Sequence, residues 1–379
     1  MAGLDRDKYE VVPVYITKAN ELWTGPRLGD IGAYKDIPGL LKSCRRAAFR
    51  VWGDRTYLET LPRSPGSRPA KARWTRLRRT SAILIDVALP VVHGTNVEDG
   101  ALQGFLETVN LPYVGANVLA SAVGMDKFTM KVMLAHGGLP VLPGLRFSTA
   151  DWHDGVIVDR VEAAFSYPVI VKPVNLGSSV GISKADDADQ LRAGLESAFS
   201  FARHVLVESG VANLREINCA VLGDELEAEA SECEEPVMTD QVLSYQDKYL
   251  TGGKDGSKKS GMASLKRKIP AEITPEQRQR IRALALEAFR YLDLSGVTRV
   301  DFLMDGATGE IWLNEVNTIP GSLAFYLWAP LGISYPDLLD RLIKLALKRQ
   351  RLSQDLTHSF ETNILAGAST GVKGGKAVS

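Results

Sequence analysis

Two carboxylates and an amide near the end of the chain have a spacing that could hold a metal ion. Gly296–Asp305 and Gly309–Gly321 each show the alternating, β-branched pattern of a strand, with turn residues between them. A turn centred near Ala307 would pair Glu315 with Arg299. Because side chains alternate along a strand, one face is then predicted to collect four polar groups: Arg299, Asp301, Glu315 and Asn317.

The chemistry expected of that face depends on what neutralises its carboxylates, which are costly to bury without a counter-ion. Oxygen-only ligands suit a hard divalent cation, so Asp301, Glu315 and Asn317 are candidate ligands for Mg²⁺ that arrives with the phosphates of a nucleotide. A solvated polar sheet face is the alternative, and the apolar residues between these positions do not separate the two. Cation binding is favoured only when phosphate-binding residues are found upstream.

Candidate phosphate-binding residues lie in the middle of the chain. Tyr167–Lys172 reads as a buried strand that ends at a lysine, and Gly177–Gly181 then leads into a second short strand. The Rossmann fingerprint and the Walker loop both require a helix after the glycines, so neither is predicted. A glycine-rich hairpin can fold over nucleotide phosphates, although such hairpins also occur without a ligand. Lys127 near the start of a predicted helix, Asp126–His136, is a further candidate or a surface lysine.

A polar loop follows the apolar run Ala82–Val92, which is typical of a strand covered on both faces of a parallel sheet. The loop continues from His93 to Gly100, and a helix is predicted after it. Ligands of open α/β sheets bind at such strand ends. His93 and Glu98 are therefore candidate substrate contacts, or residues that cap the loop.

Length and composition narrow the class of protein. The 379 residues predict two or three domains, and the 45 basic and 45 acidic residues leave no net charge to attract nucleic acid or a membrane surface. The three cysteines have no metal-type spacing, and no apolar run is long enough to cross a bilayer. These features predict a soluble cytoplasmic protein.

Four polar segments interrupt this organisation. Residues 63–79 carry seven basic and no acidic residues and are predicted to be an irregular insertion rather than a nucleic-acid patch. Residues 244–261 are glycine-rich and typical of a lid, and the tail after Ser353 is expected to be poorly ordered. The carboxylate-rich stretch Asp224–Glu235 is predicted to be an exposed hairpin edge.

Taken together, the motifs resemble the D-alanine–D-alanine ligases of the ATP-grasp superfamily. The resemblance runs colinearly from about Tyr9 to Leu347 and rests on HGTNVEDGALQG, VGMDKFTMK, VKPVNLGSSVGISK, REINCAVLG, SYQDKY and RVDFLMD followed by LNEVNTIPG. It implies an α/β ATP-grasp fold in which a parallel N-terminal α/β domain (1–115) precedes a central lobe (116–210) and a C-terminal lobe (211–351), with a flexible tail (352–379). The two lobes would clasp ATP between them.

The resemblance also implies a reaction and its cofactors. ATP phosphorylates the carboxylate of one D-alanine, and the amine of a second D-alanine attacks the acyl phosphate, for cell-wall precursor synthesis. The metal ligands would hold two Mg²⁺, with Mn²⁺ as a substitute. The ATP contacts implied by the matching positions are Lys127 and Lys172 on the phosphates, Ser179 in the phosphate loop, Glu208 on the adenine strand, Glu216 at the ribose and Lys248 from the lid. The partners would be small molecules and a second copy of the chain in a homodimer.

The remaining implied roles concern the amino-acid substrates. Arg299 and the backbone N–H of Gly321 match the site that holds the tetrahedral oxyanion. Ser178 and Tyr249 match the residues that act on the first substrate, and a tyrosine at the latter position goes with amide rather than ester products. His93, Glu98, Tyr326 and Leu327 complete the expected substrate contacts.

Three departures from the family pattern open alternatives. The family's first strand and its Glu-His loop have no counterpart here, and Val97 replaces a usual glycine. Tyr326 stands where the family has a serine for the carboxylate of the second substrate. A ligase for another D-amino acid pair is therefore one alternative. A homologue that binds ATP without ligating is the other.

Overall fold

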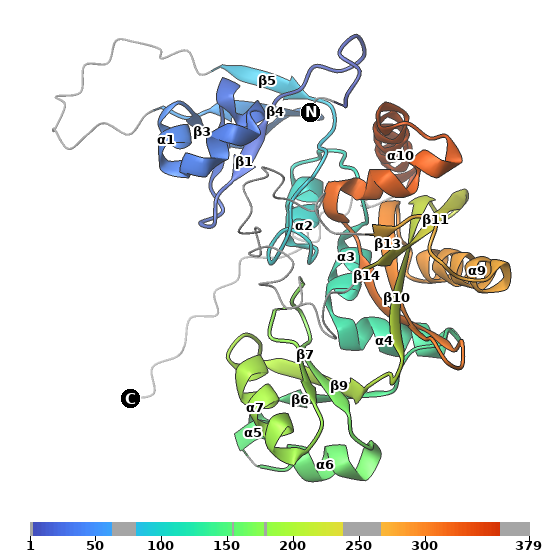
Figure 1. The fold of residues 1–379 in the computed structure, drawn as a ribbon. Helices are drawn as coiled ribbons and strands as arrows, with labels where there is room; N and C mark the ends of the chain where they lie inside the picture. Colours follow the sequence, from blue (N-terminus) through green and yellow to red (C-terminus); the bar gives the residue numbers. More distant parts are fainter. Residues whose placement is uncertain (1–2, 63–80, 154, 178–179, 238–266, 357–379) are drawn as a thin grey trace, which may run out of the picture.

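The structure, a computed structural model, describes residues 3–62, 81–153, 155–177, 180–237 and 267–356. Within these ranges the strands form three sheets. Figure 1 shows the N-terminal sheet at the upper left, the four-stranded sheet at the bottom and the C-terminal sheet at the right. The helices of the same ranges include none that combines the length and apolar character of a membrane span. The predicted insertion 63–79, the lid 244–261 and the tail from residue 357 lie outside the described residues.

The N-terminal sheet is antiparallel throughout, which corrects the predicted parallel domain. Its strands pair in sequence order, each antiparallel to the next: β1 Val14–Ile16, β2 Leu22–Thr24, β3 Arg45–Trp52, β4 Arg55–Thr60 and β5 Ala82–Ile85. Only Gly53 and Asp54 join β3 to β4. A connection that short permits a hairpin, whereas a parallel pair needs a crossover of roughly a dozen residues.

The strands of this sheet are also shorter than the sequence predicts. The expected strand 82–92 ends at Ile85 and is partly exposed at the sheet edge, so it is not covered on both faces. The helical turns η1 (Pro26–Gly29), η2 (Ile31–Asp36) and α1 (Ile37–Lys42) build a small core with Leu28 and Leu40. A separate cluster joins helix α2 (Ala101–Thr108) to the sheet through Leu106.

The central sheet has the strand order β6-β9-β7-β8. Apolar side chains of its strands pack against apolar side chains of the flanking helices and form one core. The elements are β6 Gly144–Ser148, α5 Thr149–His153, α6 Ile157–Ala164, β7 Val169–Pro173, β8 Ser183–Ala185, α7 Ala188–Phe199 and β9 His204–Ser209. Strands β7 and β8 pair antiparallel, which confirms that the glycine-rich connection joins two strands rather than a strand and a helix.

The C-terminal sheet has the strand order β12-β11-β10-β13-β14. Its strands are β10 Leu214–Gly223, β11 Ala228–Pro236, β12 Arg267–Lys268, β13 Gly296–Asp305 and β14 Ile311–Asn317. The predicted exposed hairpin edge 224–235 is the β10–β11 hairpin and is exposed at 225–227 and 229, but the prediction is wrong for two acids of β11. Glu232 and Glu234 are each 3 % exposed, because Glu232 pairs with Arg278 and Glu234 pairs with Arg267 of β12.

Two layers of helices cover the C-terminal sheet unequally. One face packs on α3 (Val118–Met125), α4 (Lys127–His136) and α9 (Pro275–Tyr291) in one large core. The other face is apolar only toward Leu222 and Val297, where the short helices η4 (Gly321–Leu327) and η5 (Ala329–Leu331) and the long helix α10 (Tyr335–Gln354) lie. The rest of that second face is polar and carries the predicted metal ligands.

Candidate active site

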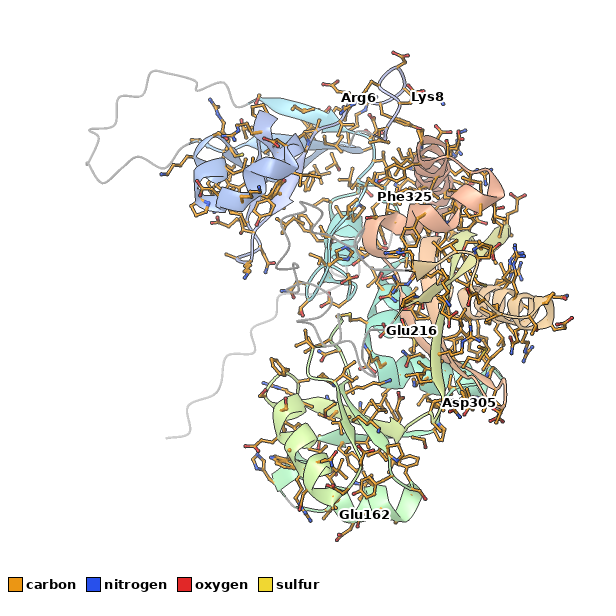
Figure 2. The ribbon with its side chains drawn as sticks, in the orientation of Figure 1. Arg6, Lys8, Glu162, Glu216, Asp305 and Phe325 are labelled. Atoms are coloured by element: carbon orange, nitrogen blue, oxygen red, sulfur yellow. The ribbon has the colours of Figure 1, made fainter. Side chains whose placement is uncertain are left out.

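A row of polar side chains crosses four strands of the C-terminal sheet. Glu234 on β11 lies opposite Asn218 on β10, Asn218 lies opposite Asp301 on β13, and Asp301 lies opposite Glu315 on β14. Directly opposite residues have Cβ atoms about 5 Å apart. Glu216 stands two positions before Asn218 on β10 and therefore on the same face. Figure 2 labels Glu216 in the middle of the molecule, where the C-terminal sheet approaches the lower lobe.

The register of this row differs from the predicted one. Arg299 lies opposite Asn317 rather than Glu315. A shift of two positions along a strand returns each side chain to the same face, so the predicted grouping on one face is confirmed although the pairs are different.

A β-bulge in β14 explains a contact that the predicted register did not include. The register slips after Asp301, which pairs with Glu315, because Phe302 pairs with Leu313 and Asn314 is the extra residue. The side-chain oxygen Oδ1 of Asn314 accepts a hydrogen bond of 3.0 Å from Nζ of Lys172. The bulge thus ties the C-terminal sheet to the lysine at the end of β7.

Arg299 and Asp301 form a buried, bidentate ion pair. Nε and Nη2 of Arg299 donate to Oδ1 and Oδ2 of Asp301 at 2.6 and 2.7 Å, and the Asn317 amide donates to the same carboxylate at 2.8 Å. Burial raises the pKa of Asp301, whereas Arg299 opposes that rise. The pair fixes the guanidinium on the polar face of the sheet.

A second buried cluster gathers two lysines around one carboxylate. Glu208 on β9 is fully buried and pairs with both Lys131 on α4 and Lys172 on β7. Burial alone would raise the pKa of Glu208, but the two ammonium groups lower it to about 2. Burial lowers the pKa of Lys131, since its charge has little access to water.

Lys127 connects this cluster to the polar row. Its Nζ lies 3.2 Å from Oε2 of Glu315 and donates to the backbone oxygen of Leu176 at 2.7 Å. The three lysines 127, 131 and 172 face the two carboxylates 208 and 315, which leaves one positive charge in excess. A buried excess of positive charge is stabilised by an anion, and phosphate groups have the required charge.

Comparison with known proteins identifies the family. The family model described as "D-ala D-ala ligase C-terminus" matches residues 133–344, and the one described as "D-ala D-ala ligase N-terminus" matches residues 1–116. The chain is a member of the D-alanine–D-alanine ligase family. A D-alanine–D-alanine ligase of Geobacillus thermodenitrificans is 37 % identical over 367 residues, which cover 95 % of this chain and 93 % of that protein. One of Acetivibrio thermocellus is 44 % identical over 271 residues, covering 70 % and 69 %.

Solved structures of family members extend the likeness to the fold. The D-alanine–D-alanine ligase of Coxiella burnetii superposes with a TM-score of 0.73 at 28 % identity, covering 93 % of this chain and 88 % of that one. The VanG D-Ala:D-Ser ligase of Enterococcus faecalis gives 0.71 at 28 % identity, covering 91 % and 92 %. The chain therefore has the α/β ATP-grasp fold of these ligases.

Among the residues assigned from the ligase family, the structure brings one subset together. Lys127 contacts the metal-ligand candidate Glu315, whereas Lys172 contacts the neighbouring Asn314 and pairs with Glu208. The Glu208 carboxylate is occupied by lysines, rather than pointing freely toward a base. Four of the assigned residues lie outside the described residues: Ser178, Ser179, Lys248 and Tyr249.

The remaining ligase-family assignments have mixed surroundings. His93 and Glu98 contact each other within their own loop, at 3.5 Å between Nδ1 and Oε1. Gly321 begins η4, and Tyr326 in the same segment donates its hydroxyl to Glu234 at 3.1 Å. Leu327 is fully buried in the core.

Three residues of the site were not predicted from the sequence. Lys131 follows Lys127 by one helical turn, so its i, i+4 spacing was an available signal. Asn314 faces Lys172 only because of the bulge, which no local pattern announces. Glu234 belonged to a stretch predicted to be exposed, and its burial follows from the neighbouring strand β12.

The donor set of the ligase site fits a divalent cation in its chemistry. Asp301 and Glu315 are directly opposite, and Asn317 adds an amide oxygen on the same face. Arg299 and Lys127 contact the two carboxylates and orient them. The described residues contain no group of three or more His, Cys, Asp and Glu side chains placed to hold an ion, and the amide is needed to complete the set.

Proposed function

We propose that this protein joins two D-alanine molecules at the expense of ATP. The γ-phosphoryl group passes to the carboxylate of the first D-alanine, giving ADP and an acyl phosphate. The amine of the second D-alanine then attacks the acyl carbon, so that a C–N bond forms, the C–O bond to phosphate breaks, and inorganic phosphate and a proton leave. Phosphorylation is required because a free carboxylate is a poor electrophile at neutral pH.

One observation carries the proposal. Lys127 on α4 and Lys172 on β7, in a cluster with one positive charge in excess, both reach β14 of the C-terminal sheet through the Lys127–Glu315 and Lys172–Asn314 contacts. Phosphates bound here would lie between the lysine ammonium groups on one side and the carboxylates of Asp301 and Glu315 on the other. Those carboxylates could hold a metal ion. Phosphoryl transfer depends mostly on such positioning and charge neutralisation.

The other residues of the site have roles that follow from their chemistry. Asp301, Glu315 and Asn317 would hold two Mg²⁺, with Mn²⁺ able to substitute, and these ions would neutralise the phosphates of ATP. Arg299, held by Asp301 at 2.6 Å, and the backbone N–H of Gly321 would stabilise the oxyanion of the tetrahedral intermediate. We further propose that ribose binds at Glu216.

The test is to incubate the purified full chain with D-alanine and Mg-ATP, then to measure ADP release and identify the product by mass spectrometry. We expect D-alanyl-D-alanine in amounts equal to ADP, and a loss of orders of magnitude in rate for Lys172→Met with its fold retained by circular dichroism. ADP release without a dipeptide, or full activity of Lys172→Met, would contradict the proposal.

A second candidate function is favoured by Tyr326, which donates to the buried Glu234 where the family has a serine. The structural neighbour VanG is a D-Ala:D-Ser ligase, which shows that acceptor choice varies at comparable similarity. A competition assay with equal D-alanine and D-serine separates the candidates. A larger yield of the mixed dipeptide than of D-alanyl-D-alanine would favour the second.

We also propose that the protein is a cytoplasmic homodimer. The three cysteines 44, 219 and 233 are free and buried, as suits a reducing compartment. Light scattering coupled to size exclusion measures the oligomeric state, and a mass near the 41.3 kDa of one chain would contradict the dimer.

A further inference from the structure

Glu234 is a buried carboxylate to which the proposed reaction gives no role. It lies on β11 and is 3 % exposed. Its Oε1 accepts hydrogen bonds from Nδ2 of Asn218 at 3.2 Å and from the hydroxyl of Tyr326 at 3.1 Å, and its Oε2 lies 3.3 Å from Nη1 of Arg267. The side chains of Asn218, Tyr326 and Arg267, which come from three parts of the chain, therefore fix the position of the Glu234 carboxylate.

The polar row sets the distance between Glu234 and the reaction centre. Asn218 separates Glu234 from Asp301, so the two carboxylates are two strands apart. Strands in a sheet are spaced by about 4.8 Å, which puts these residues about 10 Å from each other. Glu234 is therefore too far away to be a ligand of the same ion, yet it belongs to the same polar row.

A second β-bulge decides which face Glu234 occupies. Cys219 pairs with Cys233 but Val221 pairs with Ala230, so β11 has one extra residue between these pairs. As a result Glu232, the nearest acidic neighbour, points to α9 and pairs with Arg278, whereas Glu234 joins the polar row. Glu232 and Glu234 thus lie on the same strand and are equally buried, but they face opposite sides of the sheet and contact different residues.

Tyr326 is also fixed in position by contacts at its hydroxyl and at its ring. Its hydroxyl is bound by the carboxylate, and the Arg267 guanidinium lies 4.1 Å from its ring centroid. The backbone before it turns left-handed at residues 322–324, with φ of 54°, 54° and 49°. Such angles are unfavourable for L-residues, and the burial of Leu323 and Ala324 holds them in place.

Tyr326 also lies close to the guanidinium that is proposed to bind the oxyanion. Burial raises the pKa of Tyr326, Glu234 adds to that rise, and the positive charge of Arg299 opposes it. The phenol therefore stays protonated, and its O–H donates a hydrogen bond to the Glu234 carboxylate. A hydroxyl has a single hydrogen to donate, so only its lone pairs remain to meet a substrate.

We propose that Glu234 is a positioning residue for the acceptor amine: by taking the Tyr326 hydrogen, it turns the phenol oxygen into a hydrogen-bond acceptor for the amino group of the second D-alanine beside Arg299. A serine can rotate its hydrogen toward a substrate carboxylate, whereas this phenol cannot. The hydrogen-bonded pair of Glu234 and Tyr326 therefore favours the amino group, rather than the carboxylate, of the second D-alanine at this place. This inference rests on the proposed function.

The test uses Glu234→Leu, which removes the acceptor of the Tyr326 hydrogen, with Tyr326→Phe and the double variant; the KM of each D-alanine site and of ATP is measured separately. Each single change should raise the KM of the acceptor D-alanine about tenfold, the effect of one lost hydrogen bond to a charged group, and leave the KM of ATP unchanged. Because both act through one contact, the double variant should also show about tenfold rather than a hundredfold. Glu232→Leu, the matched control, should leave the acceptor KM unchanged.

The outcomes separate the two proposals. If the wild-type protein forms no dipeptide, the proposed function fails and this inference fails with it. If the wild-type protein is active, an unchanged acceptor KM in Glu234→Leu overturns the inference alone. A rise in the KM of ATP equal to the rise in the acceptor KM would also overturn it. The same holds if the change in acceptor KM of the double variant equals the product of the two single changes.

Discussion

Replacing Glu208 by glutamine tests whether the lysine cluster is held by one buried carboxylate. Lys131 and Lys172 lower the pKa of Glu208 from its ordinary value of 4.5 to about 2, against the effect of burial. A change of that size in proton affinity corresponds to about 3 kcal/mol of folding stability at neutral pH. The same figure is expected from removing one partner of a buried ion pair, about 3–5 kcal/mol, because the lysines lose their counter-ion.

The pH dependence gives the sign of the effect. Because the folded-state pKa of Glu208 is lowered, its contribution is complete above pH 4.5 and is lost as the pH falls from there toward about 2. Glu208→Gln should therefore be less stable than the wild type by about 3 kcal/mol at pH 7, with a difference that shrinks below pH 4.5.

Urea unfolding followed by fluorescence and circular dichroism, repeated at pH 7, 5, 4 and 3.5, measures this difference. Glu196→Gln on α7 is the control, since Glu196 is an exposed glutamate of the same lobe. Equal midpoints for Glu208→Gln and the wild type at pH 7 would refute the buried ion cluster. A difference that stays constant or grows toward pH 3.5 would refute the assignment of the effect to the Glu208 charge.

Three further changes test contacts between parts of the chain. Asn314→Leu removes the 3.0 Å acceptor of Lys172 and should raise the KM of ATP several-fold in steady-state assays, with the KM values of D-alanine unchanged. Gly296→Ala should lower stability by about 1–3 kcal/mol in urea unfolding, because φ is +81° and the new Cβ would stand 2.9 Å from Cα of Gly115. Arg349→Met removes both donors to backbone carbonyls of the segment before α3, and calorimetry should show a loss of about 2–3 kcal/mol; an unchanged midpoint would contradict that role.

The elements with strong local signals were predicted closely. Strand β13 runs from Gly296 to Asp305 as expected, because β-branched alternation and a turn residue define both of its ends. Helix α9 begins at Pro275 behind a capping box in which Thr274 and Gln277 satisfy each other's backbone donors. Such signals act within a few residues, so the sequence displays them directly.

Partner strands were predicted less well, because their effects act at a distance. The N-terminal strands read as parts of a parallel sheet, yet the short β3–β4 connection makes them antiparallel. The burial of Glu234 depends on Arg267 and β12, which lie more than thirty positions later in the chain. Nothing in the composition of residues 224–235 reports that a later segment will cover them.

The two β-bulges show why the candidate site could be predicted as a set but not as a geometry. Alternation along β13 and β14 places Asp301, Glu315 and Asn317 on one face in any register that differs by two, so their grouping follows from the sequence. An inserted residue breaks that alternation, and it does so at Asn314 in β14 and between Ala230 and Cys233 in β11. Each bulge turns one polar side chain toward the reaction centre, Asn314 to Lys172 and Glu234 to Tyr326. The contacts that distinguish this ligase site therefore depend on strand pairing, which becomes fixed only when the sheet forms.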